Sequence, residues 1–211
     1  MFIISFIKKG QDLNRIITSV FIMSMALVSY NFFDLPVATY FQNLKGNRLY
    51  EFFHFLTEFG KAEYFLLPAA AFYFYYKKRD ISKSLKAGFV FVSVALSGII
   101  VLLIKMIGGR FRPEMYFKEE AFGFDFFHIS HTMTSFPSGH SATALGGAAA
   151  LALLFSKYRV PFYLFGIAIM ISRVIVVRHF PSDIMIGALI GALTSYILYE
   201  RYFQKAILDA K

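Results

Sequence analysis

Six stretches of the chain contain almost no charged residues over 15 to 18 positions each. Runs of this kind are typical of helices that cross a bilayer, which needs about 20 residues. Charged residues make up only 17% of the 211 positions, too few to cover a soluble domain of this size. We therefore predict an all-α, polytopic membrane helix bundle with six transmembrane helices in a single domain, 1–211. The predicted spans are Ile16–Phe33, Ala62–Tyr76, Ala87–Ile104, Ser141–Phe155, Val160–Val177 and Ile184–Tyr199.

The absence of cysteine excludes disulfides, Cys-ligated metal sites and a thiol nucleophile. The net charge of +9 in a membrane protein indicates topology signals and anionic lipid headgroups, and we expect no nucleic-acid partner. Gly187 and Gly191 form a small-xxx-small face in the last span, which suits packing within the chain or a dimer interface. The sequence leaves the oligomeric state open.

The cationic residues predict the orientation. Segment 77–86 carries five Lys and Arg, and further cations lie in both terminal segments. By the positive-inside rule, this segment and both termini face the cytoplasm. Loops 34–61, 105–140 and 178–183 then face the exterior or periplasm across a plasma (inner) membrane.

The first outward loop has apolar residues at helical spacing. They predict a short interfacial helix in the headgroup zone, or a helix that simply packs against the bundle. These residues are Leu49, Phe52, Phe53, Leu56 and Phe59.

Polar residues gather in three clusters, all on the predicted outward side. Ionisable residues are expensive within membranes, so their positions indicate function. Together the clusters predict an anion pocket with a nucleophile and a proton donor. They are Lys105 with Arg112-Pro113, then Pro137–His140, then Ser172-Arg173 with His179 and Asp183.

Each cluster suits a phosphate in its own way. Lys105 and Arg112 provide a point charge and a planar fork for phosphoryl oxygens. Ser138 and Gly139 precede a helix whose amino end favours negative charge. A proline at position 181 opens the last span, which leaves His179 just outside the helix and Asp183 in its first turn, near enough to orient the imidazole.

The order and spacing of these residues resemble the type-2 phosphatidic acid phosphatase family of integral-membrane lipid phosphatases. The family pattern K-x6-R-P, P-S-G-H and S-R-x5-H-x3-D is matched without departure between residues 105 and 183. The first half of the chain resembles the family only in its predicted topology. The resemblance implies hydrolysis of a phosphomonoester or pyrophosphate on a phospholipid or isoprenoid-phosphate substrate at the outer face. It also implies no cofactor and no metal ion.

The resemblance further implies a role for each motif residue. His179 would attack phosphorus and form a phosphohistidine, while Asp183 holds its ring and His140 protonates the departing oxygen. Undecaprenyl pyrophosphate, lipid A 1-phosphate, phosphatidylglycerophosphate and phosphatidic acid all suit such a site. The residues that would bind the phosphoryl oxygens are Lys105, Arg112, Ser138, Gly139 and Arg173.

Several alternatives remain open. Arg110 and Arg178 are interfacial cations or contacts for a second phosphate or sugar of the headgroup. His128 and His131, three residues apart, are a weaker hypothesis for a metal pair with Glu119 or Glu120. A lipid phosphotransferase would use the same histidine, a haloperoxidase has similar motifs, and a membrane transporter is the non-enzymatic alternative.

Overall fold

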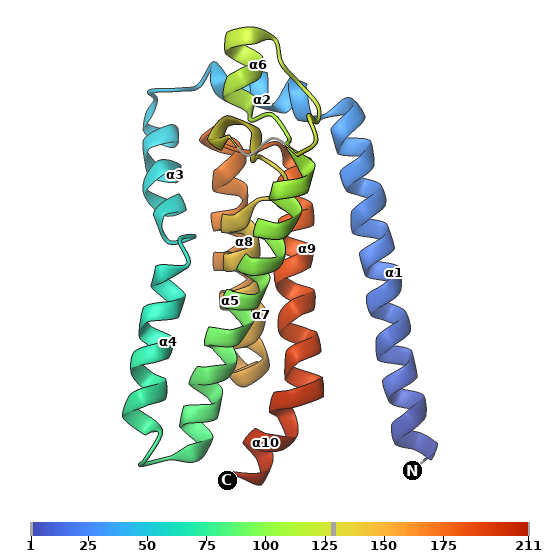
Figure 1. The fold of residues 1–211 in the computed structure, drawn as a ribbon, viewed down its shortest axis with the longest axis vertical. Coiled ribbons are helices and arrows are strands. Elements are labelled where there is room, and N and C mark those ends of the chain that lie inside the picture. Colours follow the sequence, from blue (N-terminus) through green and yellow to red (C-terminus); the bar gives the residue numbers. More distant parts are fainter. Residues whose placement is uncertain (1, 128–129, 211) are drawn as a thin grey trace.

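The computed structural model describes residues 2–127 and 130–210, with side chains from residue 12 onward. All regular elements within these residues are helical. The long helices run side by side along the long axis of the molecule (Figure 1). The main helices are α1 Phe2–Phe32, α2 Asp34–Gln42, α3 Arg48–Glu58, α4 Glu63–Tyr76, α5 Ile81–Gly108, α6 Pro113–Glu119, α7 Gly139–Leu154, α8 Arg159–Ile175, α9 Pro181–Leu198 and α10 Gln204–Asp209.

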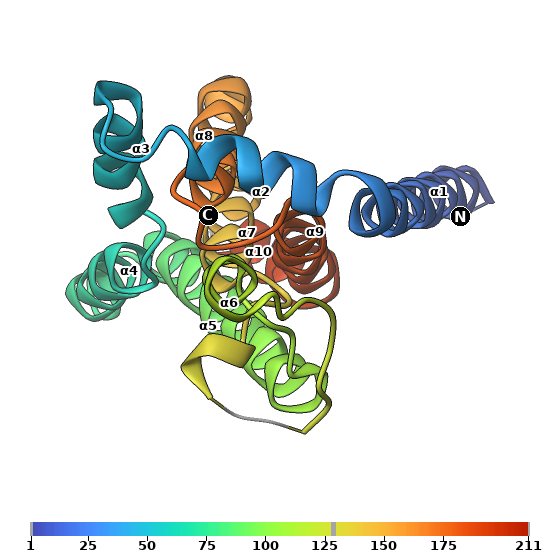
Figure 2. The same ribbon diagram turned by 90° about the horizontal axis from the view of Figure 1, so that it is seen from above.

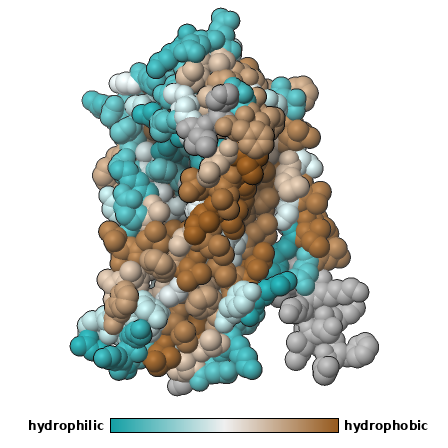
Figure 3. Space-filling view, viewed as in Figure 1, coloured by the Kyte–Doolittle hydropathy of each residue, from teal (hydrophilic) through white to brown (hydrophobic). Residues whose placement is uncertain are grey.

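Helices form at all six predicted spans, as α1, α4, α5, α7, α8 and α9. Figure 3 shows a mostly apolar middle zone between more polar ends, as expected of a membrane protein. Four of the described stretches are long and apolar enough to cross a bilayer, whereas α4 and α7 are shorter. The four stretches are Asp12–Phe32, Ile81–Gly108, Ser156–Ile175 and Pro181–Asp209.

The helix boundaries next to the polar clusters have local causes. α5 is capped at its end by Gly109, whose φ of +54° suits glycine, and a Cβ there would lie 1.7 Å from the carbonyl oxygen of Asp125. Ser138 caps α7, because its Oγ accepts a 3.4 Å hydrogen bond from the Ser141 amide. Pro181 occupies the first position of α9. Each boundary therefore places polar residues at the same end of the bundle.

α7 lies at the centre, between α5, α8 and α9, and is built largely from alanine and glycine (Figure 2). Its backbone approaches α9 closely. A Cβ on Gly187 would lie 2.3 Å from the Ser138 carbonyl oxygen, and one on Gly191 would lie 2.1 Å from the Ala142 carbonyl oxygen. The small-xxx-small face of α9 therefore serves packing within the chain.

The first loop contains two helices, whereas the sequence predicted one. α2 lies across the end of the bundle (Figure 2), while α3 stands along the long axis above α4 (Figure 1). α3 packs against α8, and Leu56 and Phe59 contact the core around Ile169. Phe52 on the same helix is exposed. The contacts of α3 thus correspond to a helix that packs against the bundle, one of the two alternatives predicted for this loop.

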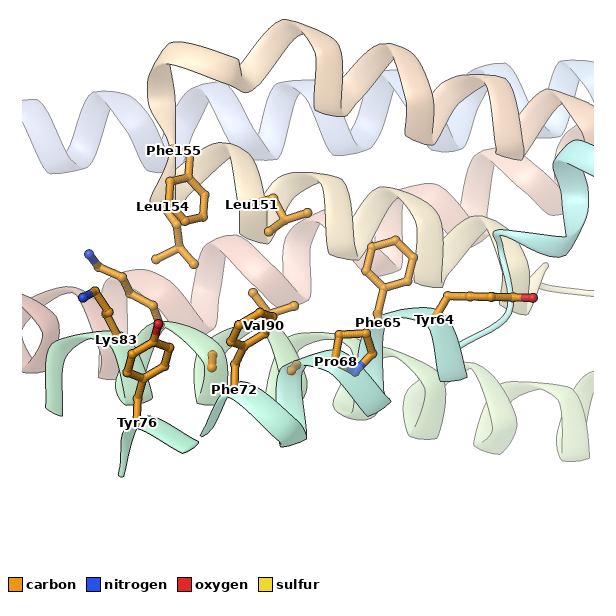
Figure 4. Close-up of a pocket in the computed structure, with 13 residues that line it drawn as sticks. Tyr64, Phe65, Pro68, Phe72, Tyr76, Lys83, Val90, Leu151, Leu154 and Phe155 are labelled. Carbon is orange, nitrogen blue, oxygen red and sulfur yellow. The ribbon is translucent and has the colours of Figure 1, made fainter. Parts of the chain in front are cut away.

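The two ends of the bundle differ. The start of α1, the end of α10 and the α4–α5 connection lie at one end, and the motif loops lie at the other (Figure 1). An apolar groove of about 510 Å³ between α4, α5 and α7 has Lys83 and Tyr76 at one end and Tyr64 at the other (Figure 4). Lys83 and Lys86 lie near the start of α5, whereas Lys105 lies in its last turn. The predicted cytoplasmic cations and the predicted site are therefore separated by the length of the bundle.

We expect Gly191→Ala to destabilise the protein by about 1–3 kcal/mol, because the added methyl group overlaps the α7 backbone. Gly98→Ala is the matched control, since a Cβ at Gly98 of α5 meets nothing within 4 Å. It should leave stability unchanged or raise it by up to about 1 kcal/mol. Thermal unfolding in detergent measures both. Equal midpoints for the two variants would contradict the close α7–α9 contact.

Candidate active site

The structure brings the three motifs together at one end of the bundle, from six places along the chain. Lys105 lies in the last turn of α5, Arg112 precedes α6, and Ser138 caps α7, which begins at Gly139. The third motif lies across the α8–α9 connection, with Arg173 in the last turn of α8, His179 in the connection and Asp183 in the first turn of α9.

Each motif cation is oriented by a hydrogen bond to a neighbouring segment. Lys105 donates to the carbonyl oxygen of Thr134, and Arg112 Nε donates to that of His131 at 2.7 Å. Arg173 donates through one terminal nitrogen to Thr57 Oγ1 of α3 at 2.7 Å. Its Nε is buried without a hydrogen-bond partner among the described residues. The guanidinium thus retains capacity for an anionic ligand.

His179 lies within the field of all three cations. Its ring is 3% exposed, and burial together with the charges of Arg112, Arg173 and Lys105 lowers its pKa well below the ordinary value. The interaction with Asp183 acts in the opposite direction but is the smaller effect. His179 is therefore neutral near pH 7, as a nucleophilic imidazole must be.

Ser135 connects His179 to Asp183. The distance from His179 Nδ1 to Asp183 Oδ2 is 3.7 Å, longer than a hydrogen bond. The Ser135 hydroxyl donates to the same carboxylate oxygen at 2.6 Å and lies 3.5 Å from Nδ1. The backbone amide of Phe180 also donates to this oxygen, at 2.9 Å. Asp183 is thus held in place beside the ring by two further donors.

Ser138 and His140 lie at the start of α7 with different surroundings. Ser138 Oγ accepts a 2.9 Å hydrogen bond from the Ser141 hydroxyl, so its own proton can be donated to an anion. His140 is partly exposed and packs over Gly60, where a Cβ would come within 2.9 Å of the ring. Burial, together with the charges of Arg173, Lys61, Arg112 and Lys105, lowers the pKa of His140 to about 3.

Arg110 matches neither alternative considered from the sequence, an interfacial cation or a contact for a second phosphate or sugar. Its side chain is 1% exposed and bonded to Ser182, Asp183 and Asp34. No face of this guanidinium is open to a headgroup. Arg178 differs, because its side chain is 45% exposed at the rim and 3.7 Å from a carboxylate oxygen of Glu114.

The described part of the structure does not support the hypothesis of a metal site at His128 and His131. His128 lies outside the described residues. Among residues 2–127 and 130–210, no group of three or more His, Asp or Glu side chains is arranged to hold a metal ion.

Four further residues of the site lie outside the motifs and were not predicted: Asp34, Thr57, Ser135 and Ser182. Only Asp34 carried a sequence signal, as a lone carboxylate at the end of the first apolar run.

A family model described as the PAP2 superfamily matches residues 86–207, more than half of the chain, and includes all three motifs. The chain belongs to the PAP2 superfamily. The resemblance noted from the motifs is thereby confirmed, and the expectation of a membrane protein agrees with it.

Two relatives of this chain are named lipid A 1-phosphatase. That of Rhizobium etli is 37% identical over 145 residues, which cover 67% of this chain and 61% of the relative. That of Rhizobium johnstonii is 37% identical over 138 residues, covering 65% of this chain and 55% of the relative. This chain therefore spans about three fifths of the length of the curated relatives it matches.

Two crystal structures share the fold. LpxE of Aquifex aeolicus aligns with a TM-score of 0.62 and 24% identity, over 79% of this chain and 94% of the other. The PAP2-type phosphatidylglycerolphosphate phosphatase of Bacillus subtilis aligns with a TM-score of 0.58 and 18% identity, over 88% and 94%. At these identities the likeness supports the PAP2 fold alone.

The lowered pKa of His179 predicts how stability depends on pH. Below its ordinary pKa the ring takes up a proton in the unfolded chain but not in the folded one, so folding stability falls on acidification from neutral pH. The contribution of this histidine is at most about 1.4 kcal/mol per pH unit. His179→Gln should show a shallower decline in unfolding midpoint between about pH 7.5 and 5.5 than the wild type.

His54→Gln is the matched control for this experiment, because His54 is an exposed histidine of α3 outside the motif cluster. It should keep the wild-type decline. An unchanged decline in His179→Gln would show that the ring takes up its proton equally in the folded and unfolded chains.

Proposed function

We propose that this PAP2-superfamily protein is a lipid phosphate phosphatase that works through a phosphohistidine at His179. The observation that carries the proposal is the position of a neutral, buried imidazole within the field of Arg112, Arg173 and Lys105. Three converging cations suit the oxygens of a phosphoryl group and the charge that develops on them in the transition state.

The proposed reaction has two steps. His179 attacks phosphorus, the bond from phosphorus to the lipid oxygen breaks, and His140 gives that oxygen its proton. His140 then takes a proton from water as the water oxygen attacks the phosphohistidine, which releases phosphate and restores both histidines. Asp183 holds the His179 ring throughout, and Ser135 fixes that carboxylate.

The phosphoryl oxygens are held by side chains and by the start of α7. Lys105, Arg112 and Arg173 supply positive charge, which gives the reaction its stabilisation without a metal ion. Ser138 donates its hydroxyl proton, and Gly139 opens the helix, where backbone N–H groups lack intrahelical partners.

We further propose that six helices cross the plasma membrane, with both termini in the cytoplasm and the site at the outer face. The cations of segment 77–86 lie at the end of the bundle opposite the motifs, which supports this orientation (Figure 1). The relatives named lipid A 1-phosphatase make lipid A 1-phosphate the first substrate to test. Undecaprenyl pyrophosphate, phosphatidylglycerophosphate and phosphatidic acid are the other members of the panel.

The purified protein in detergent should release phosphate from at least one lipid of this panel with a chelator present. His179→Ala should lower the rate by at least about 1,000-fold, and rapid-quench samples should lose protein-bound phosphate. The rate should show a bell-shaped pH profile, because His179 must start neutral and His140 protonated. Since burial and the nearby cations lower the pKa of His140, the negative charge of the bound phosphate has to raise it again. His54→Gln is the control and should remain active.

Three results would contradict this mechanism: residual turnover in His179→Ala close to that of the wild type, loss of activity on chelation, or a flat pH profile. Formation of a phosphorylated product when an acceptor lipid is added would instead identify a lipid phosphotransferase that uses the same histidine.

Arg178 should contact the headgroup beyond the reacting phosphate, because it is the exposed cation at the rim of the site. Arg178→Gln should raise KM about 10-fold for a substrate with a second phosphate or sugar, a loss of about 1.4 kcal/mol of binding, with kcat little changed. Phosphatidic acid, which lacks such a group, should be hydrolysed with unchanged KM. An equal rise in KM for both substrates would contradict this role of Arg178.

A further inference from the structure

Arg110 joins two carboxylates beneath the histidine. One terminal nitrogen of its guanidinium donates to Asp183 and to Ser182 Oγ, the latter at 2.7 Å. The other donates to Asp34 at 2.6 Å. Both carboxylates are fully buried. A single planar cation therefore links the first turn of α9 to the start of α2.

Aromatic rings enclose this guanidinium. Its central carbon lies 4.7 Å from the ring centre of Phe180 and 5.0 Å from that of Tyr30, with Phe122 and Phe124 within 5.8 Å. The rings exclude water and lower the local dielectric, which strengthens each ion pair and each cation–π contact. The orientation of Arg110 is thus determined by its two carboxylate partners, whose attraction the surrounding rings strengthen.

Asp34 is itself held rigidly at the corner between α1 and α2. Its Oδ1 accepts hydrogen bonds from the Ser29 hydroxyl at 2.8 Å and from the Ser182 amide at 3.0 Å. Its Oδ2 accepts from the Ser182 hydroxyl as well as from Arg110. With both oxygens engaged, the carboxylate fixes Arg110 from the side opposite Asp183.

We propose that Asp34, acting through Arg110, positions Asp183 and thereby the His179 ring for attack on phosphorus. This inference rests on the proposed function and adds the α1–α2 corner, outside all three motifs, to the catalytic apparatus. Among the described residues, the side-chain hydrogen bonds of Asp34 and Arg110 join them to each other, to Ser29, Ser182 and Asp183, and not to the His179 ring, so they are positioning residues.

Asp34 contributes a second negative charge to the environment of Arg110. Two carboxylates share one guanidinium, so Asp183 keeps enough negative charge to hold the Nδ1 side of His179 through the Ser135 bridge. Without the Asp34 charge, Arg110 would act on Asp183 alone and lose its second anchor. Alignment of the ring would suffer, whereas phosphate binding would not, because Arg112 and Arg173 are anchored elsewhere.

The test is Asp34→Asn, which preserves the shape of the side chain and removes its charge. Relative to the wild type, kcat should fall at least about 10-fold with KM within about 2-fold, because only the chemical step depends on ring alignment. Glu200→Gln is the matched control. It breaks a 2.8 Å ion pair with Arg15 of α1 near the far end of the bundle, and kcat should be unchanged. Equal kcat values for the two variants would overturn the proposal.

A milder pair covers the case in which Asp34→Asn does not fold. Ser29→Ala removes one hydrogen bond to Asp34, while Ser19→Ala removes a hydroxyl of α1 that donates to the Arg15 carbonyl within the same helix. We expect kcat to fall about 3-fold or more in Ser29→Ala and to stay at the wild-type value in Ser19→Ala, with KM unchanged in both. Equal kcat in these two variants would also overturn the proposal.

The wild type and His179→Ala set the upper and lower limits of the assay. An inactive wild type would remove the proposed function and this inference with it. An active wild type and an inactive His179→Ala, beside a fully active Asp34→Asn, would contradict the positioning role alone.

Discussion

A charge buried in an apolar surrounding is stable only when it is paired, and this constraint determines how one end of the bundle is assembled. Asp34 and Asp183 come from helices at opposite ends of the sequence, and both are fully buried. Arg110 is the cation that pairs them. The α1–α2 corner, the loop after α5 and the start of α9 must therefore meet at one point, and the position of His179 follows from that meeting.

Within the described part of the chain, the three motif cations, unlike Arg110, are not paired with carboxylates. Lys105, Arg112 and Arg173 are oriented by carbonyl and hydroxyl oxygens instead of carboxylates, so their charges remain largely uncompensated. Like charges brought together in this way favour an anionic ligand. The site thus contains two kinds of cation, one neutralised for structure and three left available. The proposed phosphatase mechanism uses both kinds, because Arg110 holds the partner of the proposed nucleophile and the other three would hold the phosphoryl group.

The motif residues could be found from the sequence because their spacing in the chain is itself the signal. The role of Arg110 could not be found in this way. It lies two residues from Arg112, and the neighbouring sequence does not show which of the two arginines is buried in an ion pair and which is available to a ligand. Asp34 and Ser135 were missed for a related reason, because their partners lie 148 and 48 residues away. α2 was missed because a proline near its start and its short length give a weak helical pattern.

The sequence by itself determined that the chain is an all-helical membrane protein of the PAP2 superfamily, since hydropathy and motif spacing are properties of the linear chain. It also supplied the candidate residues for the proposed phosphate chemistry. Only the tertiary structure decided which arginine is neutralised, what holds Asp183, and that the α1–α2 corner reaches the site. These features depend on which charged side chains from distant segments lie next to each other in the interior. That arrangement exists only in the folded bundle.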